Sequence, residues 1–81
     1  MHVKIRLFAR LRELAAAGEL EREIADGATA ADAWHLLTRE FPAIADYSRN
    51  VACAVNEEYA QLSARLHDGD EVAFLPPVSG G

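Results

Sequence analysis

The sequence has very little cysteine and no long hydrophobic run, and both absences narrow the possible protein classes. Its one cysteine, Cys53, excludes an internal disulfide and cannot by itself form a zinc site. No apolar stretch approaches the roughly 20 residues that a membrane-spanning helix needs. The first residues also lack the apolar segment of a secretory signal. We therefore expect a cytoplasmic protein that does not enter a membrane.

Recognisable catalytic motifs are also missing from the chain. It contains no G-x-S-x-G, no P-loop and no G-x-G-x-x-G. Its three histidines, His2, His35 and His67, are far apart and lack metal-binding spacing. The acids within residues 57–58 and 68–71 are typical of turns, where carboxylates accept hydrogen bonds from backbone N–H groups. We expect no metal site and no catalytic residue in the chain.

Basic residues are scarce but concentrated at the start of the chain. The formal net charge is -5, yet the first twelve residues carry no acid and four basic side chains: Lys4, Arg6, Arg10 and Arg12. Nucleic-acid binding needs clustered lysine and arginine, so this mostly acidic chain is not expected to bind nucleic acid. The basic cluster either steers an acidic partner or, more simply, is a solvated face.

What the chain does contain is an alternation of strand and helix patterns within one domain. Residues 2–8 and 19–24 alternate polar and apolar side chains, as half-buried strands do. Residues 9–17 have helical spacing, with Gly18 at the expected C-cap. The best helix follows over residues 30–41: Thr29 is its predicted N-cap, Trp34 lies in its apolar stripe and Pro42 ends it.

The second half of the chain predicts three shorter strands. Residues 43–50 are a polar connection, and 51–55 form a strand whose small residues allow packing on both faces, with Cys53 as a buried, unreactive thiol. A turn at 56–58 and a brief strand from Tyr59 follow. Leu66 is a core anchor, and the turn at residues 68–70 leads into a last strand with Val72 and Phe74 pointing inward. The order predicts an α+β domain with one main helix across a small mixed sheet.

Three large apolar side chains do not fit the core pattern. Phe8 continues the polar face of Lys4 and Arg6, and Leu75 continues the face of Glu71. Tyr59 lies just past a turn. These side chains are either candidates for a partner interface or single exposed hydrophobic residues of no significance.

Residues 76–81 are uncharged, and we predict that they form an extended tail on a domain of residues 1–75. Two prolines fix φ and favour a strut, which at about 3.3 Å per residue reaches roughly 20 Å. Glycine has no Cβ, so the final Gly-Gly pair is thin enough to enter a narrow channel and leaves the carboxylate as the functional group. The alternative is a frayed end or linker. The strand that leads into the tail favours a functional arm.

Three segments together resemble the small, sulfur-carrying subunit of molybdopterin synthase. They are residues 3–14, VKIRLFARLREL; residues 54–56, AVN; and residues 68–81, DGDEVAFLPPVSGG. The resemblance spans nearly the whole chain and is least distinctive over residues 19–50. It implies a ubiquitin-like β-grasp fold, which agrees with the predicted order of elements.

The resemblance also implies a function in molybdenum cofactor biosynthesis. In that family, an ATP-using adenylyltransferase similar to ubiquitin-activating enzymes adenylates the terminal glycine, here Gly81, and a sulfur donor protein converts it into a thiocarboxylate. The tail then enters the large catalytic subunit, where the sulfur passes to cyclic pyranopterin monophosphate. The chain is implied to bind no cofactor itself and to be the non-catalytic, sulfur-donating subunit of a heterotetrameric sulfurtransferase.

Roles for individual residues follow from the same resemblance. Gly81 is the implied covalent carrier of sulfur. The implied inserted residues of the tail are Pro76, Pro77, Val78, Ser79 and Gly80. The implied contacts with partner proteins are Phe8, Tyr59 and Leu75.

Three alternatives share the same sequence features. A sulfur carrier of the thiamine pathway has the same fold and Gly-Gly end, although the Pro-Pro-Val-Ser segment favours the molybdopterin assignment. A ubiquitin-like protein modifier, conjugated to lysines through Gly81, uses the same activated terminus. A plain binding domain with an incidental tail is the simplest alternative.

Overall fold

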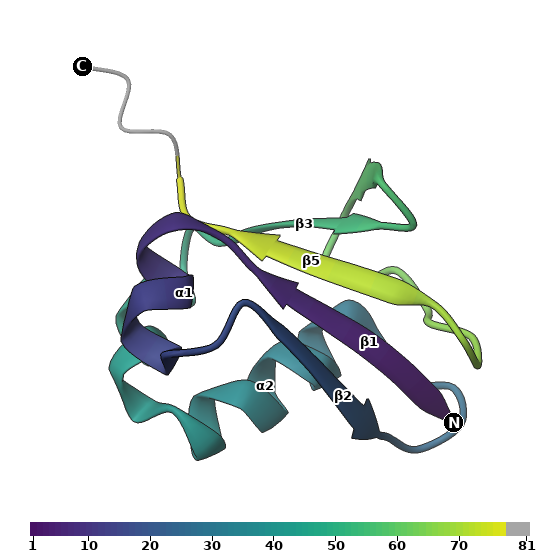
Figure 1. The fold of residues 1–81 in the computed structure, drawn as a ribbon. Coiled ribbons are helices and arrows are strands. Elements are labelled where there is room, and N and C mark those ends of the chain that lie inside the picture. Colours follow the sequence, from purple (N-terminus) through teal and green to yellow (C-terminus); the bar gives the residue numbers. More distant parts are fainter. Residues whose placement is uncertain (78–81) are drawn as a thin grey trace.

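Five strands form one sheet, and the α-helices lie on one side of it (Figure 1). This arrangement comes from a computed structural model, which describes residues 1–77. The elements in chain order are β1 (His2–Leu7), α1 (Ala9–Ala15), β2 (Glu19–Glu23), α2 (Ala30–Glu40), the 3-10 helix η1 (Pro42–Tyr47), β3 (Ala52–Val55), β4 (Glu58–Ala60) and β5 (Glu71–Leu75).

The sheet is mixed, with the strand order β2-β1-β5-β3-β4. Its two neighbouring strands β1 and β5 run parallel, and the other neighbours pair antiparallel. The first and last strands therefore lie side by side in the sheet (Figure 1). The prediction of an α+β domain with a main helix across a small mixed sheet is confirmed. Within residues 1–77, no helix is long and apolar enough to cross a membrane.

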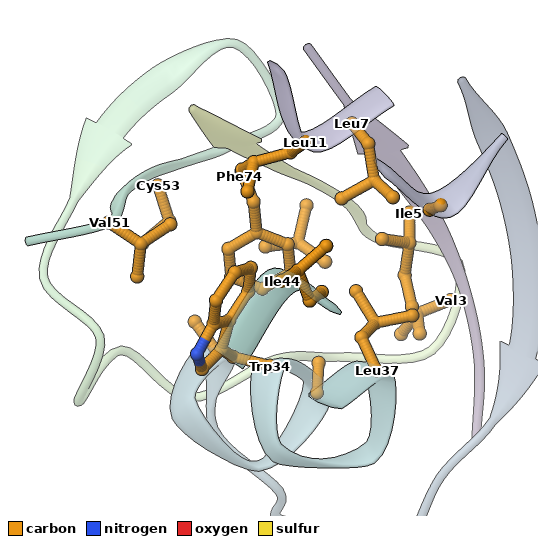
Figure 2. Close-up of a cluster of buried hydrophobic side chains, with 14 of the residues drawn as sticks. Val3, Ile5, Leu7, Leu11, Trp34, Leu37, Ile44, Val51, Cys53 and Phe74 are labelled. Carbon is orange, nitrogen blue, oxygen red and sulfur yellow. The ribbon is translucent and has the colours of Figure 1, made fainter. Parts of the chain in front are cut away.

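The core lies between α2 and the face of the sheet that the helices cover. The rings of Trp34 and Phe74 meet there at a centroid distance of 5.1 Å, and the side chains of β1 lie to one side of them (Figure 2). The predicted core roles of Trp34 and Leu66 are confirmed, because each is only 2% exposed. The Trp34 indole N–H also donates a hydrogen bond of 2.9 Å to the Ser48 hydroxyl, which satisfies its polar atom.

Helix α2 begins and ends as its sequence predicts. The Thr29 hydroxyl accepts a hydrogen bond from the Asp32 N–H, and the Asp32 carboxylate accepts one from the Thr29 N–H. This capping box satisfies two backbone donors that the first turn of a helix leaves unpaired. The hydrogen bonds of Thr29 hold the pKa of Asp32 below its usual range, with the backbone N–H as the main cause. At the other end, the Phe41 N–H bonds the Leu37 carbonyl before Pro42.

The predicted end of the first helix is wrong. Helix α1 ends at Ala15, and Ala16, with φ of 56°, occupies the left-handed C-cap position that we had assigned to Gly18. Gly18 instead leaves room for a neighbouring side chain. A Cβ on Gly18 would lie 2.9 Å from Nε of Arg12, so the missing side chain lets the guanidinium pack against the backbone.

The predicted polar connection over residues 43–50 is also wrong in part. Residues Pro42–Tyr47 form η1, and Ile44 within it is fully buried. A 3-10 helix has three residues per turn, so Ile44 and Tyr47 project from the same side, and Tyr47 packs against the core. The two turns of η1 are too few for this spacing to stand out in the sequence.

Candidate docking face and tail site

The predicted tail leaves the fold at the end of β5. Pro76 is half-buried and Pro77 is exposed. Neither proline can donate a backbone hydrogen bond, and the β5 ladder ends at Leu75, before them. Four residues of the predicted tail lie outside the described residues: Val78, Ser79, Gly80 and Gly81.

The face of the sheet opposite the helices, here called the outer face, is built from alternate residues of the strands. Along β5, Val72 and Phe74 enter the core as predicted, while Ala73 and Leu75 lie on the outer face. The outer face runs to the end of β5 and so reaches the start of the tail (Figure 1). A protein that receives the tail is therefore positioned to contact this face as well.

Strand register aligns the residues of the outer face in rows. One row crosses all five strands and consists of Glu19, Arg6, Ala73, Ala54 and Tyr59. The next row places Leu75 opposite Ala52. Residues opposite one another in neighbouring strands are close enough for their side chains to interact. The centre of the outer face is thus made of short alanine side chains, and larger apolar and charged groups surround it.

Phe8 lies on the predicted side of the first strand. It follows β1 as the N-cap residue of α1, and its N–H bonds the Phe74 carbonyl at 3.3 Å. Its ring lies 5.0 Å from the guanidinium carbon of Arg6, a cation–π distance, which places both side chains on the outer face. Phe8 is half-buried and is not among the hydrophobic residues that pack against the core.

The other two predicted contact residues differ in exposure. Tyr59 is 80% exposed and is the one large hydrophobic residue of positions 1–77 that is fully open to solvent. Leu75 is half-buried and, like Phe8, does not pack against the core. All three side chains therefore lie on or beside one face of the sheet, although the sequence places them in three separate segments.

The far end of the outer face is charged and internally paired. Lys4 contacts Glu19 at 3.4 Å, and the His2 ring contacts Glu21 at 2.7 Å and Glu23 at 3.2 Å. The hydrogen bond to Glu21, followed by that to Glu23, raises the pKa of His2. This end is the more distant one from the tail, so the apolar part of the outer face and the tail share one end of the domain (Figure 1).

The match to a known family covers nearly the whole chain. A family model described as the ThiS family matches residues 5–81. The chain belongs to the ThiS family. The molybdopterin synthase sulfur carrier subunit of Chlamydomonas reinhardtii is 39% identical over 83 residues, with 100% of both chains covered. The subunit of the same name from Arabidopsis thaliana is 37% identical, covering 100% of this chain and 84% of that protein.

Solved structures support the same fold for this ThiS family member. The small archaeal modifier protein 1 (SAMP1) of Haloferax volcanii superimposes with a TM-score of 0.84 at 32% identity, covering 100% of both chains. The ubiquitin-like β-grasp fold is thereby confirmed, as is the resemblance to the small subunit of molybdopterin synthase.

Sequence reasoning missed the alanine centre of the outer face in this ThiS family member. We predicted that the strand of residues 51–55 packs on both faces, but only one face meets the core. Cys53 is 1% exposed on that side, whereas Ala52 and Ala54 are half-buried on the outer face. Their signal was present as the alternation of alanine with larger residues in β3. It could be interpreted only once the positions of the helices were known.

The predicted roles of Cys53 and, among the turn acids, of Asp68 and Asp70 are confirmed. Burial raises the pKa of the Cys53 thiol, which disfavours the reactive thiolate. The Asp68 carboxylate accepts a hydrogen bond from the His2 N–H, and Asp70 accepts one from the His67 N–H. The Asn56 amide also donates to Asp70 at 3.0 Å and is the main cause that lowers the pKa of Asp70. Within residues 1–77, no three potential ligands cluster as a metal site.

Proposed function

We propose that this chain carries sulfur for molybdopterin synthesis, with the carboxyl group of Gly81 as the carrying group. The observation that carries the proposal is the full-length similarity to molybdopterin synthase sulfur carrier subunits. A second observation supports it: an uncovered sheet face ends where the tail begins. The chain is then the non-catalytic member of a sulfurtransferase, and the large subunit supplies the active site.

The chemistry requires activation of the tail by another protein. A C-terminal carboxyl group has a pKa of about 3.5, so at neutral pH it is a carboxylate and a poor acyl electrophile. We propose that the Gly81 carboxylate attacks the α-phosphorus of ATP on an adenylyltransferase and expels pyrophosphate. Sulfide-level sulfur from a donor protein then attacks the carbonyl carbon and expels AMP, which leaves the thiocarboxylate. The ATP belongs to the activating enzyme, and this chain needs no cofactor of its own.

The outer face is suited to successive docking with two partners. The activating enzyme and the large subunit must each receive the same tail, so each must approach the same end of the domain. We propose that Phe8, Tyr59 and Leu75 contact both partners in turn. The alanine centre lets a partner approach the sheet closely, and Pro76 and Pro77 reduce the entropy that the tail loses on insertion.

Intact-mass measurement tests the carrier role directly. The protein is incubated with the adenylyltransferase of its own organism, ATP and a sulfide source. We expect the mass to rise by the difference between one sulfur and one oxygen, and fragmentation to locate the change at Gly81. With an active enzyme, no mass change would rule out the carrier role.

Removal of Gly81 alone separates a functional tail from a structural one. We expect the thermal unfolding temperature to stay unchanged and sulfur transfer to disappear. The matched variant Phe8→Ala is expected to keep the tail chemistry and the folded domain but to weaken binding to the large subunit. A large loss of stability in Phe8→Ala would contradict the placement of Phe8 on the outer face.

Protein modification is a second candidate function, and the similarity to SAMP1 favours considering it. The activated Gly81 would then react with a lysine amine instead of sulfide and form an isopeptide bond. Mass spectrometry of a cell extract for Gly-Gly remnants on lysine residues distinguishes the two. Lysine adducts that vanish when Gly81 is deleted would support modification.

A further inference from the structure

Two arginines flank a small pocket at the edge of the outer face. The pocket has a volume of about 250 Å³, and its lining residues include Arg6, Phe8, Arg12, Gly18 and Glu19. We call it the arginine pocket. Arg6 and Phe8 belong both to this pocket and to the outer face, so the pocket is continuous with the proposed docking surface.

The fold holds both guanidinium groups in place. That of Arg6 lies 5.0 Å from the centre of the Phe8 ring. The Arg12 side chain lies against the backbone at Gly18, where a Cβ would come within 2.9 Å of Nε. The Leu7 N–H bonds the Gly18 carbonyl at 3.0 Å and fixes this loop beside β1. These contacts place both guanidinium groups beside the pocket.

Within residues 1–77, Glu19, which lies opposite Arg6 in the sheet, offsets only part of the positive charge of the pocket. Neither Arg6 nor Arg12 forms an ion pair there, whereas Lys4 pairs with Glu19 at 3.4 Å and Arg10 pairs with Glu13 at 3.4 Å. Glu19 is the one acid that lines the pocket, and Lys4 already engages it. What distinguishes Arg6 and Arg12 from the other arginines is that both line one pocket.

We infer that the arginine pocket binds an acidic side chain of the partner protein that docks on the outer face. A guanidinium presents its N–H donors as a planar fork that fits a carboxylate, and two guanidiniums around one small pocket fit a single Asp or Glu well. Such a contact fixes the rotation of the partner on the flat sheet, which apolar contacts alone leave free. It also accelerates encounter with an acidic partner. The inference relies on the proposed function for the identity of that partner.

Binding to the large subunit of molybdopterin synthase from the same organism tests the inference. Arg6→Gln and Arg12→Gln are each expected to raise the Kd about tenfold at low salt, mainly through slower association. Both variants should also show a weaker dependence of Kd on salt concentration than the wild type. Arg39→Gln on α2 removes the same charge from the other side of the sheet, and we expect less than about a twofold change.

Two further variants test geometry separately from charge. Arg12→Lys keeps the charge but loses the planar fork, so its affinity is expected to fall between those of the wild type and Arg12→Gln. Gly18→Ala keeps both arginines but displaces the Arg12 side chain from its position. We expect this variant to fold normally and to weaken binding by a factor similar to that of Arg12→Gln.

The outcomes separate this inference from the proposed function. If the wild type does not bind the large subunit, the proposed function fails. If the wild type binds and both arginine variants bind equally well with the same salt dependence, the arginine pocket is not a partner contact. The alternative is that the pocket binds a small anion. Titration with pyrophosphate, monitored through the NMR signals of the arginine side chains, tests this alternative. Saturable pyrophosphate binding at the pocket, with large-subunit affinity unchanged in the variants, would overturn the inference.

Discussion

The two faces of the sheet are built from the same strands but differ in size, cover and charge. On the inner face, Val72 and Phe74 are fully buried beneath α2. On the outer face, their neighbours Ala73 and Leu75 are half-buried, and neither α-helix lies over them (Figure 1). Residues one position apart therefore differ in environment, and we propose that the buried ones serve stability and the outer ones recognition. Substitutions of adjacent residues can test that division.

The largest effect is expected from a break in the inner face. Phe74→Ala removes the ring that meets Trp34 at 5.1 Å and is expected to lower the free energy of unfolding by about 3–5 kcal/mol. Leu75→Ala is the matched control one residue away on the outer face, with an expected loss of about 1 kcal/mol or less. Urea unfolding measures both. Equal losses would contradict the assignment of the two faces.

A charge at the centre of the outer face is expected to break recognition without breaking the fold. Ala73→Arg places a long cation between Ala54 and Arg6, where a docked partner would have to bury it. We expect binding to the large subunit to weaken about 100-fold, because a buried unpaired charge is costly. Ala25→Arg adds the same charge at an exposed position after β2 and should leave affinity unchanged. Unchanged affinity in Ala73→Arg would place the interface elsewhere.

The cap of α2 affects only the inner face, through the helix that covers it. Thr29→Ala removes one side of the capping box and is expected to lower the free energy of unfolding by about 1 kcal/mol. Thr38→Ala in the same helix removes a hydroxyl that bonds the His35 carbonyl and should change stability by less than about 0.5 kcal/mol. Thermal unfolding gives the comparison. Neither variant should change affinity for the large subunit.

The smallest effect is expected at the charged end of the outer face. Glu21 raises the pKa of His2 above 6.5, and His2 lowers the pKa of Glu21 below 4.5. The contribution of His2 to the free energy of unfolding is complete below pH 6.5 and is lost as the pH rises through the raised pKa of His2. The glutamate contribution is lost as the pH falls through the lowered value. His2→Gln should therefore reduce the unfolding temperature most at a pH between the lowered pKa of Glu21 and the raised pKa of His2, and hardly at all at pH 9. A difference that is constant with pH would show that this ion pair has no net effect.

Sequence patterns were sufficient to predict the strands, the main helix and the core, because each pattern is local. The alternation from Val72 to Leu75 and the stripe around Trp34 need no knowledge of other elements. The breaks in the alternation singled out Phe8 and Leu75, and Tyr59 beside a turn, as candidate contact residues, and the resemblance supported the same three. The alanines between them were missed, since an alanine in a strand is compatible with either face. Ile44 was missed because a 3-10 helix of six residues makes only two turns, which is too short to show a period.

The parallel pairing of β1 and β5 also determines how the domain responds to mechanical force. The chain enters β1 at one end of the sheet and leaves β5 at the opposite end (Figure 1). Tension between Met1 and Leu75 therefore slides the two strands past each other along their length. In this shear geometry, the backbone hydrogen bonds between the two strands carry the load together. The bond between the Lys4 N–H and the Asp70 carbonyl lies at one end of this series, and the bond between the Phe8 N–H and the Phe74 carbonyl lies at the other. A pull on the end of β5 that is opposed at the first residues thus loads these hydrogen bonds in shear, so that they must break together and not one after another.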